Sequence, residues 1–246
     1  MKKIFLTSYI GGANKVGDTR LPAPLMSDNG LVDRLRSAWT ENAKLLFICA
    51  SPDDHEKNDL VCECMKISFP MSGLSVSGID VCDNRTEART EHLNEYDAVF
   101  LSGGHVPTQN AFMRRIGLRE KLASFPGLVI AYSAGSMNCA DIVYSAPELD
   151  GEAIDPDFQR WIPGLGLTDI NIYPHYGWLK DEMLDGMRVM EDITYPDSFR
   201  HEIIALMDGS YILIENGHET LYGEGFSIRD GVLRKICGHG ESAMLK

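Results

Sequence analysis

Short apolar segments alternate with helical segments through the first two-thirds of the chain. Strands that are apolar throughout are buried on both faces, and helices that connect such strands make them parallel. This alternation predicts a three-layer, doubly wound α/β fold with a mostly parallel sheet. The expected strands span residues 3–7, 44–50, 74–81, 98–101 and 127–131. The expected helices span residues 31–39, 54–69, 85–94 and 109–122, and Pro70 is expected to stop the second.

The last third of the chain has a different pattern. Short apolar runs there are separated by Asp-Gly and Asn-Gly pairs, which are strong signals for hairpin turns. We expect these hairpin strands to extend the same sheet in antiparallel fashion, so that residues 1–246 form a single domain. The expected strands span residues 203–206, 210–214, 220–222 and 232–236.

Composition excludes several classes of function. The net charge of −13 opposes binding to nucleic acids or to an anionic membrane surface, because both require a basic face. No apolar run approaches the roughly 20 residues of a membrane span, and the N-terminus lacks the pattern of a signal peptide. None of the six cysteines has the spacing of a zinc or redox motif. We therefore expect a cytoplasmic protein with reduced, mostly buried thiols.

Residues 131–137 contain the pattern that points most directly to chemistry. A serine between a buried strand and a helix is the arrangement of a nucleophile elbow, in which a sharp turn exposes the hydroxyl above the sheet. Ser133 is the candidate nucleophile, with a helix expected over residues 137–143. Ala131 occupies the position of the first glycine of the usual motif. The alternative is an ordinary strand-to-helix turn of small residues.

A serine nucleophile requires a base and a group that orients the base. Ligands of parallel sheets lie beyond the carboxyl ends of the strands, where we expect the loops 8–17, 102–108 and 132–136. His175 follows an apolar run and Pro174, and His105 follows a diglycine, so both are candidates for that edge. The spacing of the acids leaves the third group open among Glu148, Asp150, Glu152, Asp155 and Asp157.

Four motifs in the same order resemble the peptidase E (aspartyl dipeptidase) family, within the class I glutamine amidotransferase-like superfamily. The resemblance covers roughly residues 40–225 and implies a flavodoxin-like fold. The motifs are Ser-Gly-Gly at 102–104, Tyr-Ser-Ala-Gly-Ser-Met-Asn at 132–138, Ala-Pro-Glu at 146–148 and Pro-His-Tyr at 174–176.

The resemblance implies a role for individual residues. Ser133 would be the nucleophile, His175 the base and Glu148 the third member of the triad. The backbone N–H groups of Gly104 and Ala134 would form the oxyanion hole.

The resemblance also implies a substrate class, which is small peptides and in particular dipeptides with an N-terminal aspartate. Arg200, Arg188 and His105 are the candidates for holding that aspartate. No metal or cofactor is implied, and a homodimer is a candidate assembly.

Three other functions compete with this interpretation. A glutamine amidotransferase would carry cysteine at the elbow, where this chain has Ser133, and Cys139 is expected in the core. A cyanophycinase-like enzyme or another amide hydrolase would use the same serine on a different substrate. A catalytically silent protein of this fold would bind a small molecule or a partner without chemistry.

Overall fold

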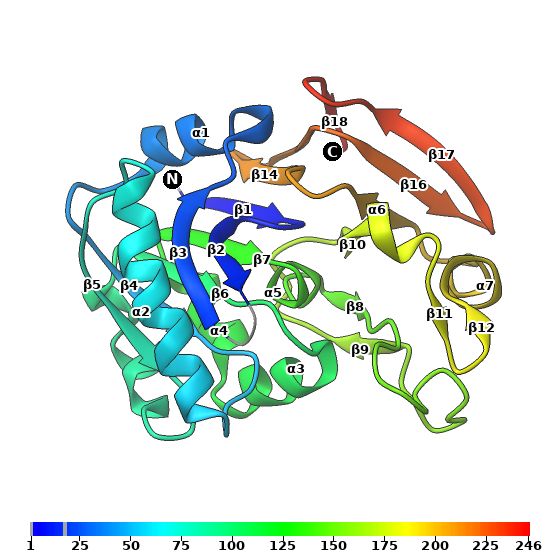
Figure 1. The fold of residues 1–246 in the computed structure, drawn as a ribbon, viewed down its shortest axis with the longest axis horizontal. Coiled ribbons are helices and arrows are strands. Elements are labelled where there is room, and N and C mark those ends of the chain that lie inside the picture. Colours follow the sequence, from blue (N-terminus) through cyan, green and yellow to red (C-terminus); the bar gives the residue numbers. More distant parts are fainter. Residues whose placement is uncertain (1, 17–18) are drawn as a thin grey trace.

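A central eight-stranded sheet organises the molecule (Figure 1). The computed structural model describes residues 2–16 and 19–246. The strand order is β18-β15-β14-β1-β7-β6-β4-β5, in which β1, β7, β6, β4 and β5 are parallel and β14, β15 and β18 are antiparallel. The parallel strands are β1 (Lys3–Thr7), β4 (Ala43–Ile48), β5 (Val76–Cys82), β6 (Ala98–Leu101) and β7 (Leu128–Tyr132). The antiparallel strands are β14 (Tyr211–Glu215), β15 (His218–Tyr222) and β18 (Ser242–Met244). The predicted α/β class with a mostly parallel sheet is confirmed.

The helices between the parallel strands depart from the expected ranges in two places. Pro70 lies inside the last turn of α2 rather than stopping it, and Asp54 caps the first turn by accepting a hydrogen bond from the Lys57 backbone N–H. Residues 109–122 form two helices because Gly117 takes a left-handed conformation between them. The helices of this half are α1 (Leu31–Ala38), α2 (His55–Met71), α3 (Val106–Arg115) and α4 (Leu118–Ser124), with 3₁₀ helices η1 (Asp28–Gly30) and η2 (Glu87–Glu95).

The expectation that every C-terminal strand extends the main sheet is wrong, because several of them form a second, four-stranded sheet. Its order is β10-β13-β16-β17, with β10 and β13 parallel. Strand β13 is buried along its whole length, and its backbone N–H and C=O groups are satisfied by β10 on one edge and β16 on the other. The strands are β10 (Asn171–Tyr173), β13 (Ile203–Leu206), β16 (Gly225–Arg229) and β17 (Val232–Cys237).

Shorter elements connect the two sheets and surround their edges. The predicted loop 8–17 contains a strand that pairs with the next segment, although Gly17 lies outside the described residues. The helix expected over residues 137–143 is wrong: the helix after Ser133 ends at Met137, and residues 142–144 form a strand. The hairpins are β2 (Gly11–Val16) with β3 (Thr19–Leu25), β8 (Ile142–Tyr144) with β9 (Trp161–Pro163), and β11 (Met183–Leu184) with β12 (Met187–Arg188). The short helices are α5 (Ala134–Met137), α6 (Tyr176–Leu179), η3 (Val189–Thr194) and α7 (Tyr195–Asp197).

Two apolar clusters form the core, one around the main sheet and one between the second sheet and β8. The six cysteines are free and buried, as the sequence predicted. Among the described residues, no helix is both long and apolar enough to cross a membrane. In Figure 1 the parallel strands and α2 occupy the left half, while α6, α7, β11, β12 and the strands of the second sheet lie to the right. The candidate site lies where these two halves meet.

Candidate active site

Ser133 sits at a strained turn directly after β7. Its φ of 52° and ψ of −124° are a conformation that costs a non-glycine residue on the order of 1–3 kcal/mol. Neighbouring hydrogen bonds hold the turn in place. The Ser133 N–H donates to the Thr7 carbonyl at 3.0 Å, and the Ser136 hydroxyl donates to the same oxygen at 2.9 Å. The sequence predicted this nucleophile-elbow geometry from the strand and the small residues after it.

Glycines on both sides of Ser133 permit the close packing of the elbow. A Cβ at Gly135 would collide with the Leu101 carbonyl, so only glycine lets α5 approach β6 this closely. A Cβ at Gly103 would collide with the Tyr132 ring and press against Ser133. The elbow therefore depends on Gly135, two residues after the serine, and on Gly103, which follows the neighbouring strand β6.

Two backbone N–H groups are available beside the serine hydroxyl. Ala134 is the first residue of α5, so its N–H has no partner within that helix. Gly104 lines the same cavity as Ser133. These are the two residues whose N–H groups the resemblance assigns to an oxyanion hole; Gly104 lines the cavity, and Ala134 directly follows Ser133.

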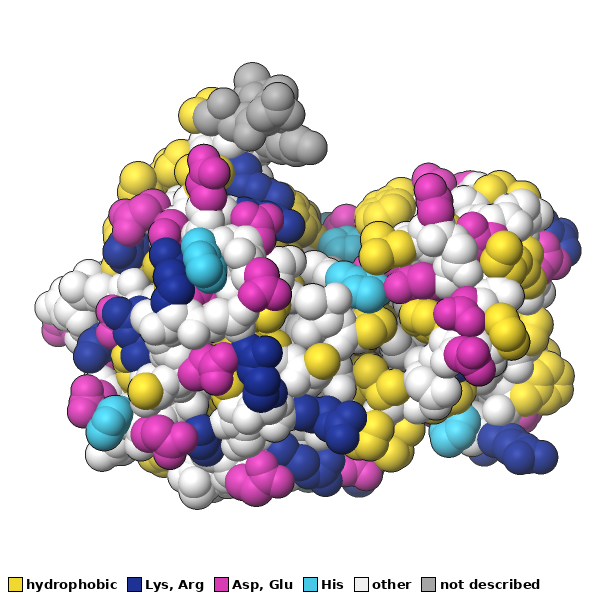
Figure 2. Space-filling view, turned by 90° about the horizontal axis from the view of Figure 1, so that it is seen from below, with side chains coloured by type: hydrophobic (Ala, Val, Ile, Leu, Met, Phe, Trp, Pro, Cys, Tyr) yellow, Lys and Arg dark blue, Asp and Glu magenta, His cyan; other side chains and the backbone are white. Residues whose placement is uncertain are grey.

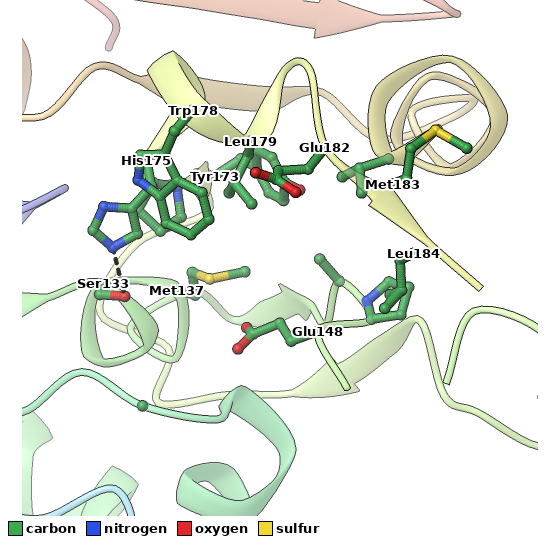
Figure 3. Close-up of a pocket in the computed structure, with 15 residues that line it drawn as sticks. Ser133, Met137, Glu148, Tyr173, His175, Trp178, Leu179, Glu182, Met183 and Leu184 are labelled. Carbon is green, nitrogen blue, oxygen red and sulfur yellow. Dashed lines mark hydrogen bonds between the residues drawn. The ribbon is translucent and has the colours of Figure 1, made fainter. Parts of the chain in front are cut away.

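His175 brings the second sheet into contact with the elbow. Its Nε2 lies 3.0 Å from the Ser133 hydroxyl oxygen, and its Nδ1 lies 2.7 Å from Asp208 Oδ1 (Figure 3 shows the first contact). Because a carboxylate only accepts, Nδ1 carries the proton and Nε2 is free to accept from the serine hydroxyl. The three side chains thus have the hydrogen-bonding arrangement that is typical of a serine nucleophile, its base and an orienting acid.

Strand pairing explains why these residues meet. Strands β10 and β13 are parallel neighbours, with Tyr173 opposite Ala205, so the segments that leave their carboxyl ends lie side by side. His175 follows the first of these strands and Asp208 follows the second. Strands β1 and β7 are also parallel neighbours, with Thr7 opposite Tyr132, which places Ser8 beside Ser133.

Asp208 occupies the place that the resemblance gave to Glu148. Glu148 lines the cavity from the loop after β8, whereas Asp208 reaches His175 from the turn between the two sheets. Burial favours a raised pKa for Asp208, but the hydrogen bonds and charge from His175, with the bond from Ser8, outweigh it and hold that pKa below its usual value. Asp208 is therefore an ionised partner for His175.

Ser8 ties the histidine and the aspartate together, and the sequence placed it only within a broad loop. Its hydroxyl donates to Asp208 Oδ1 at 2.8 Å and accepts from the His175 backbone N–H at the same distance. His175 itself has a left-handed backbone, with φ of 59°. The Trp178 ring lies 5.4 Å from the imidazole and closes its other side. One residue from the main sheet thus fixes two residues from the second.

A cavity of about 400 Å³ opens from Ser133 and His175. Figure 2 shows the hollow between the two halves of the molecule, with histidine, hydrophobic and acidic side chains around it. In Figure 3, Glu148 and Glu182 point into the cavity from opposite walls. Burial, together with the charge of Glu152, raises the pKa of Glu148 to about 7. The rest of the cavity wall that Figure 3 labels is formed by Met137, Tyr173, Trp178, Leu179, Met183 and Leu184.

Hydrogen bonds hold the acidic wall in place. Glu152 accepts from the Glu148 backbone N–H at 2.8 Å, and its other oxygen lies 2.8 Å from His105 Nε2. The Asp185 carboxylate, in the β11–β12 hairpin, accepts from the Gly151 and Ala153 backbone N–H groups. The loop that carries Glu148 and the hairpin beside Glu182 are therefore fastened to each other.

The basic residues considered for substrate binding lie elsewhere. Arg188 makes two side-chain hydrogen bonds to Asp192, and Arg200 is exposed in the turn after α7. His105 is engaged by Glu152 and Thr108. Among the described residues, no lysine or arginine lines the cavity. An aspartate anchor of the expected kind is therefore missing from the described walls.

Cys139, the candidate for a glutaminase nucleophile, is fully buried. Its thiol donates to the Gly135 carbonyl, and burial raises its pKa to about 12. A thiolate is the reactive form of cysteine, so this environment opposes nucleophilic chemistry at Cys139.

The fold and the contacts around Ser133 are typical of serine hydrolases of the α/β class. The sequence matches the model of peptidase family S51 over residues 26–222. The chain therefore belongs to this family of serine peptidases. The match confirms the resemblance to the peptidase E family. Among curated proteins, no sequence matches the chain.

Two solved structures share the fold. A peptidase from an acI-B1 Actinobacterium superposes with a TM-score of 0.64 at 13% identity, covering 100% of this chain and 97% of the other. A putative peptidase E protein from Listeria monocytogenes superposes with a TM-score of 0.59 at 16% identity, covering 96% of this chain and 100% of the other. At these identities, the likeness establishes the architecture alone.

Proposed function

We propose that this protein hydrolyses small peptides through an acyl-enzyme formed on Ser133. The observation that carries the proposal is the chain of contacts from Ser133 Oγ to His175 Nε2 and from His175 Nδ1 to Asp208. The strained elbow supports it, because strain of this kind is concentrated at functional sites.

The geometry supports the following sequence of steps. His175 Nε2 takes the hydroxyl proton as Ser133 Oγ attacks the peptide carbonyl, and Asp208 stabilises the imidazolium that forms. The negative charge on the carbonyl oxygen is met by the N–H groups of Gly104 and Ala134; removing one such donor typically costs about 3 kcal/mol of transition-state stabilisation. His175 then gives the proton to the leaving amine, and a water molecule activated by the same imidazole hydrolyses the acyl-enzyme.

The cavity indicates the size of the substrate. Its volume of about 400 Å³ suits one or two residues of a peptide rather than a folded chain. We therefore propose dipeptides and similarly short peptides as substrates. A preference for N-terminal aspartate, which the family resemblance implied, has no basic partner among the described lining residues to support it.

Hydrolysis of a dipeptide panel tests this proposal. We expect wild-type protein to release free amino acids and the Ser133→Ala variant to lose this activity by a factor of about 10⁵ or more. Ser37→Ala, at an exposed serine on α1, is the matched control and should behave as wild type. Equal rates for the wild-type protein and the Ser133→Ala variant on every peptide would contradict the proposal.

A further inference from the structure

Two carboxylates face the cavity without a basic partner. Glu148 and Glu182 belong to different loops, yet Figure 3 shows both side chains directed into the space beside Ser133 and His175. Neither carboxylate forms an ion pair or a side-chain hydrogen bond within the described residues. The other acids around them are engaged, since Glu152 contacts His105 and Asp185 accepts from two backbone N–H groups. Two carboxylates are thus left for a ligand.

The cavity combines these charges with apolar walls. Met137, Tyr173 and Trp178 line it on the side of the nucleophile, and Leu179 and Leu184 line it near Glu182. Long basic side chains bury an aliphatic stem against apolar surface while the charged head meets a polar partner. The cavity is larger than the side chain of aspartate needs, and an extended side chain would fill it better.

We propose that Glu148 and Glu182 select substrates that carry a positively charged side chain, lysine or arginine, on the residue whose carbonyl Ser133 attacks. This inference rests on the proposed peptidase function. The aliphatic stem lies along the apolar walls, and the ammonium or guanidinium group lies between the two carboxylates. The contact chain at Ser133 defines the site, and the two carboxylates decide which side chain enters it.

Charge repulsion accounts for the side chains that are rejected. An aspartate side chain would bring a third carboxylate next to Glu148 and Glu182, with no cation among the described walls to offset it. A neutral side chain would gain apolar contact but would leave the two acids unpaired. Discrimination therefore combines attraction for one class with repulsion of another.

A panel of four dipeptides tests how the charge of the first residue's side chain affects hydrolysis. We compare kcat/KM for Lys-Leu, Arg-Leu, norleucyl-Leu and Asp-Leu, all of which carry the same α-ammonium group. The expected order is Lys-Leu and Arg-Leu first, norleucyl-Leu about tenfold lower, and Asp-Leu lower by about 100-fold or more. Equal rates for Lys-Leu and norleucyl-Leu, or fastest hydrolysis of Asp-Leu, would overturn the inference.

Variants assign the preference to the two residues. Glu148→Gln and Glu182→Gln should each reduce the ratio of Lys-Leu to norleucyl-Leu hydrolysis. The double variant should lose the preference for lysine. Glu182→Lys should raise Asp-Leu hydrolysis above the wild-type value. Glu41→Gln, at an exposed glutamate outside the cavity, is the matched control.

Phosphonate analogues separate failure of the inference from failure of the function. Diphenyl phosphonates that carry the side chain of lysine, norleucine or aspartate form a covalent bond with an activated serine. Faster labelling of Ser133 by the lysine analogue supports the inference even where no dipeptide is turned over. Labelling without a preference for lysine overturns the inference and leaves the proposed function standing. No labelling by any analogue, together with no hydrolysis, rejects both.

Discussion

The two sides of the active-site cavity are built differently. On one side, Ser133 and Gly104 follow strands of the main sheet, and regular backbone hydrogen bonds fix the ends of those strands. On the other side, short segments between β8 and η3 carry Glu148, Glu182 and most of the apolar wall. The first side supplies the nucleophile, and the second supplies His175 together with the surroundings of the substrate side chain.

The elbow that holds the nucleophile and the wall that surrounds the substrate side chain therefore depend on different kinds of contact. The position of Ser133 depends on the pairing of the parallel strands β1, β7 and β6 and on glycines that tolerate no Cβ, so most changes there disrupt the elbow. The wall is held by side-chain-to-backbone contacts such as those of Glu152 and Asp185. Residues on the wall can therefore change while the elbow keeps its geometry. Substitutions on the two sides should accordingly have different signatures.

Removal of the base should have the largest effect. His175→Ala leaves Ser133 without a proton acceptor, and we expect kcat/KM to fall by about 10⁵-fold on every peptide in a panel. Circular dichroism should show an unchanged fold. A loss confined to one class of substrate would indicate that His175 selects substrates rather than acting as the base.

The acid that orients His175 should be revealed by two isosteric variants. Asp208→Asn removes the charge and permits the wrong tautomer of His175, so we expect kcat to fall by about 10⁴-fold. Glu148→Gln should leave kcat for a neutral peptide within about threefold of wild type, because Glu148 belongs to the wall. Single-turnover rates measure both effects, and the opposite ranking would restore Glu148 as the orienting acid.

Ser8→Ala tests the contact between the two sheets at the site. The variant loses the bond to Asp208 and the bond from the His175 backbone, and we expect kcat to fall by about tenfold with little change in KM. The pH profile of kcat should shift because Asp208 loses one donor. Ser124→Ala, at an exposed serine of α4, serves as the control and should show neither change.

The smallest expected effect is a change in the free energy of unfolding with pH, and it comes from Glu148 in the cavity wall. The pKa of Glu148 is raised to about 7, so the folded protein keeps this proton to a higher pH than the unfolded chain does. The unfolded state therefore loses the proton first, and stability decreases as pH rises from about 4.5 to about 7. Glu148→Gln removes this penalty.

Thermal unfolding measures the effect. Solvent reaches Glu148 through the cavity and weakens the penalty. We therefore expect the Glu148→Gln variant to have a free energy of unfolding higher than that of wild type by on the order of 1 kcal/mol at pH 8, or about 2–4 °C in Tm, and no difference at pH 4. A gain of equal size at both pH values would indicate a cause other than ionisation.

The sequence predicted the main sheet and the elbow well because both depend on local patterns. The apolar strands, the glycines at 103–104 and the small residues around Ser133 are all visible without tertiary contacts. His175 was found from its place after an apolar run and Pro174. The helix boundaries at Pro70 and Gly117 were missed by a few residues, since a proline is tolerated in a last turn and a glycine can divide a helix.

Asp208 and the second sheet were missed for one reason. Asp208-Gly209 is a hairpin signal, and the sequence does not show that the strands on its two sides belong to different sheets. Strand β13 pairs with β10 rather than with β14, and only that pairing brings Asp208 beside His175. The family resemblance therefore favoured Glu148, whereas strand order places Asp208 at the histidine.

Covalent labelling of Ser133 tests the central claim most directly. Intact-mass analysis and peptide mapping after treatment with a fluorophosphonate should show one adduct per chain, on Ser133, in the wild-type protein. Labelling should be absent in Ser133→Ala and slowed by at least about 100-fold in His175→Ala. An adduct on another residue, or equal rates with and without His175, would contradict the account of Ser133 as a nucleophile activated by that histidine.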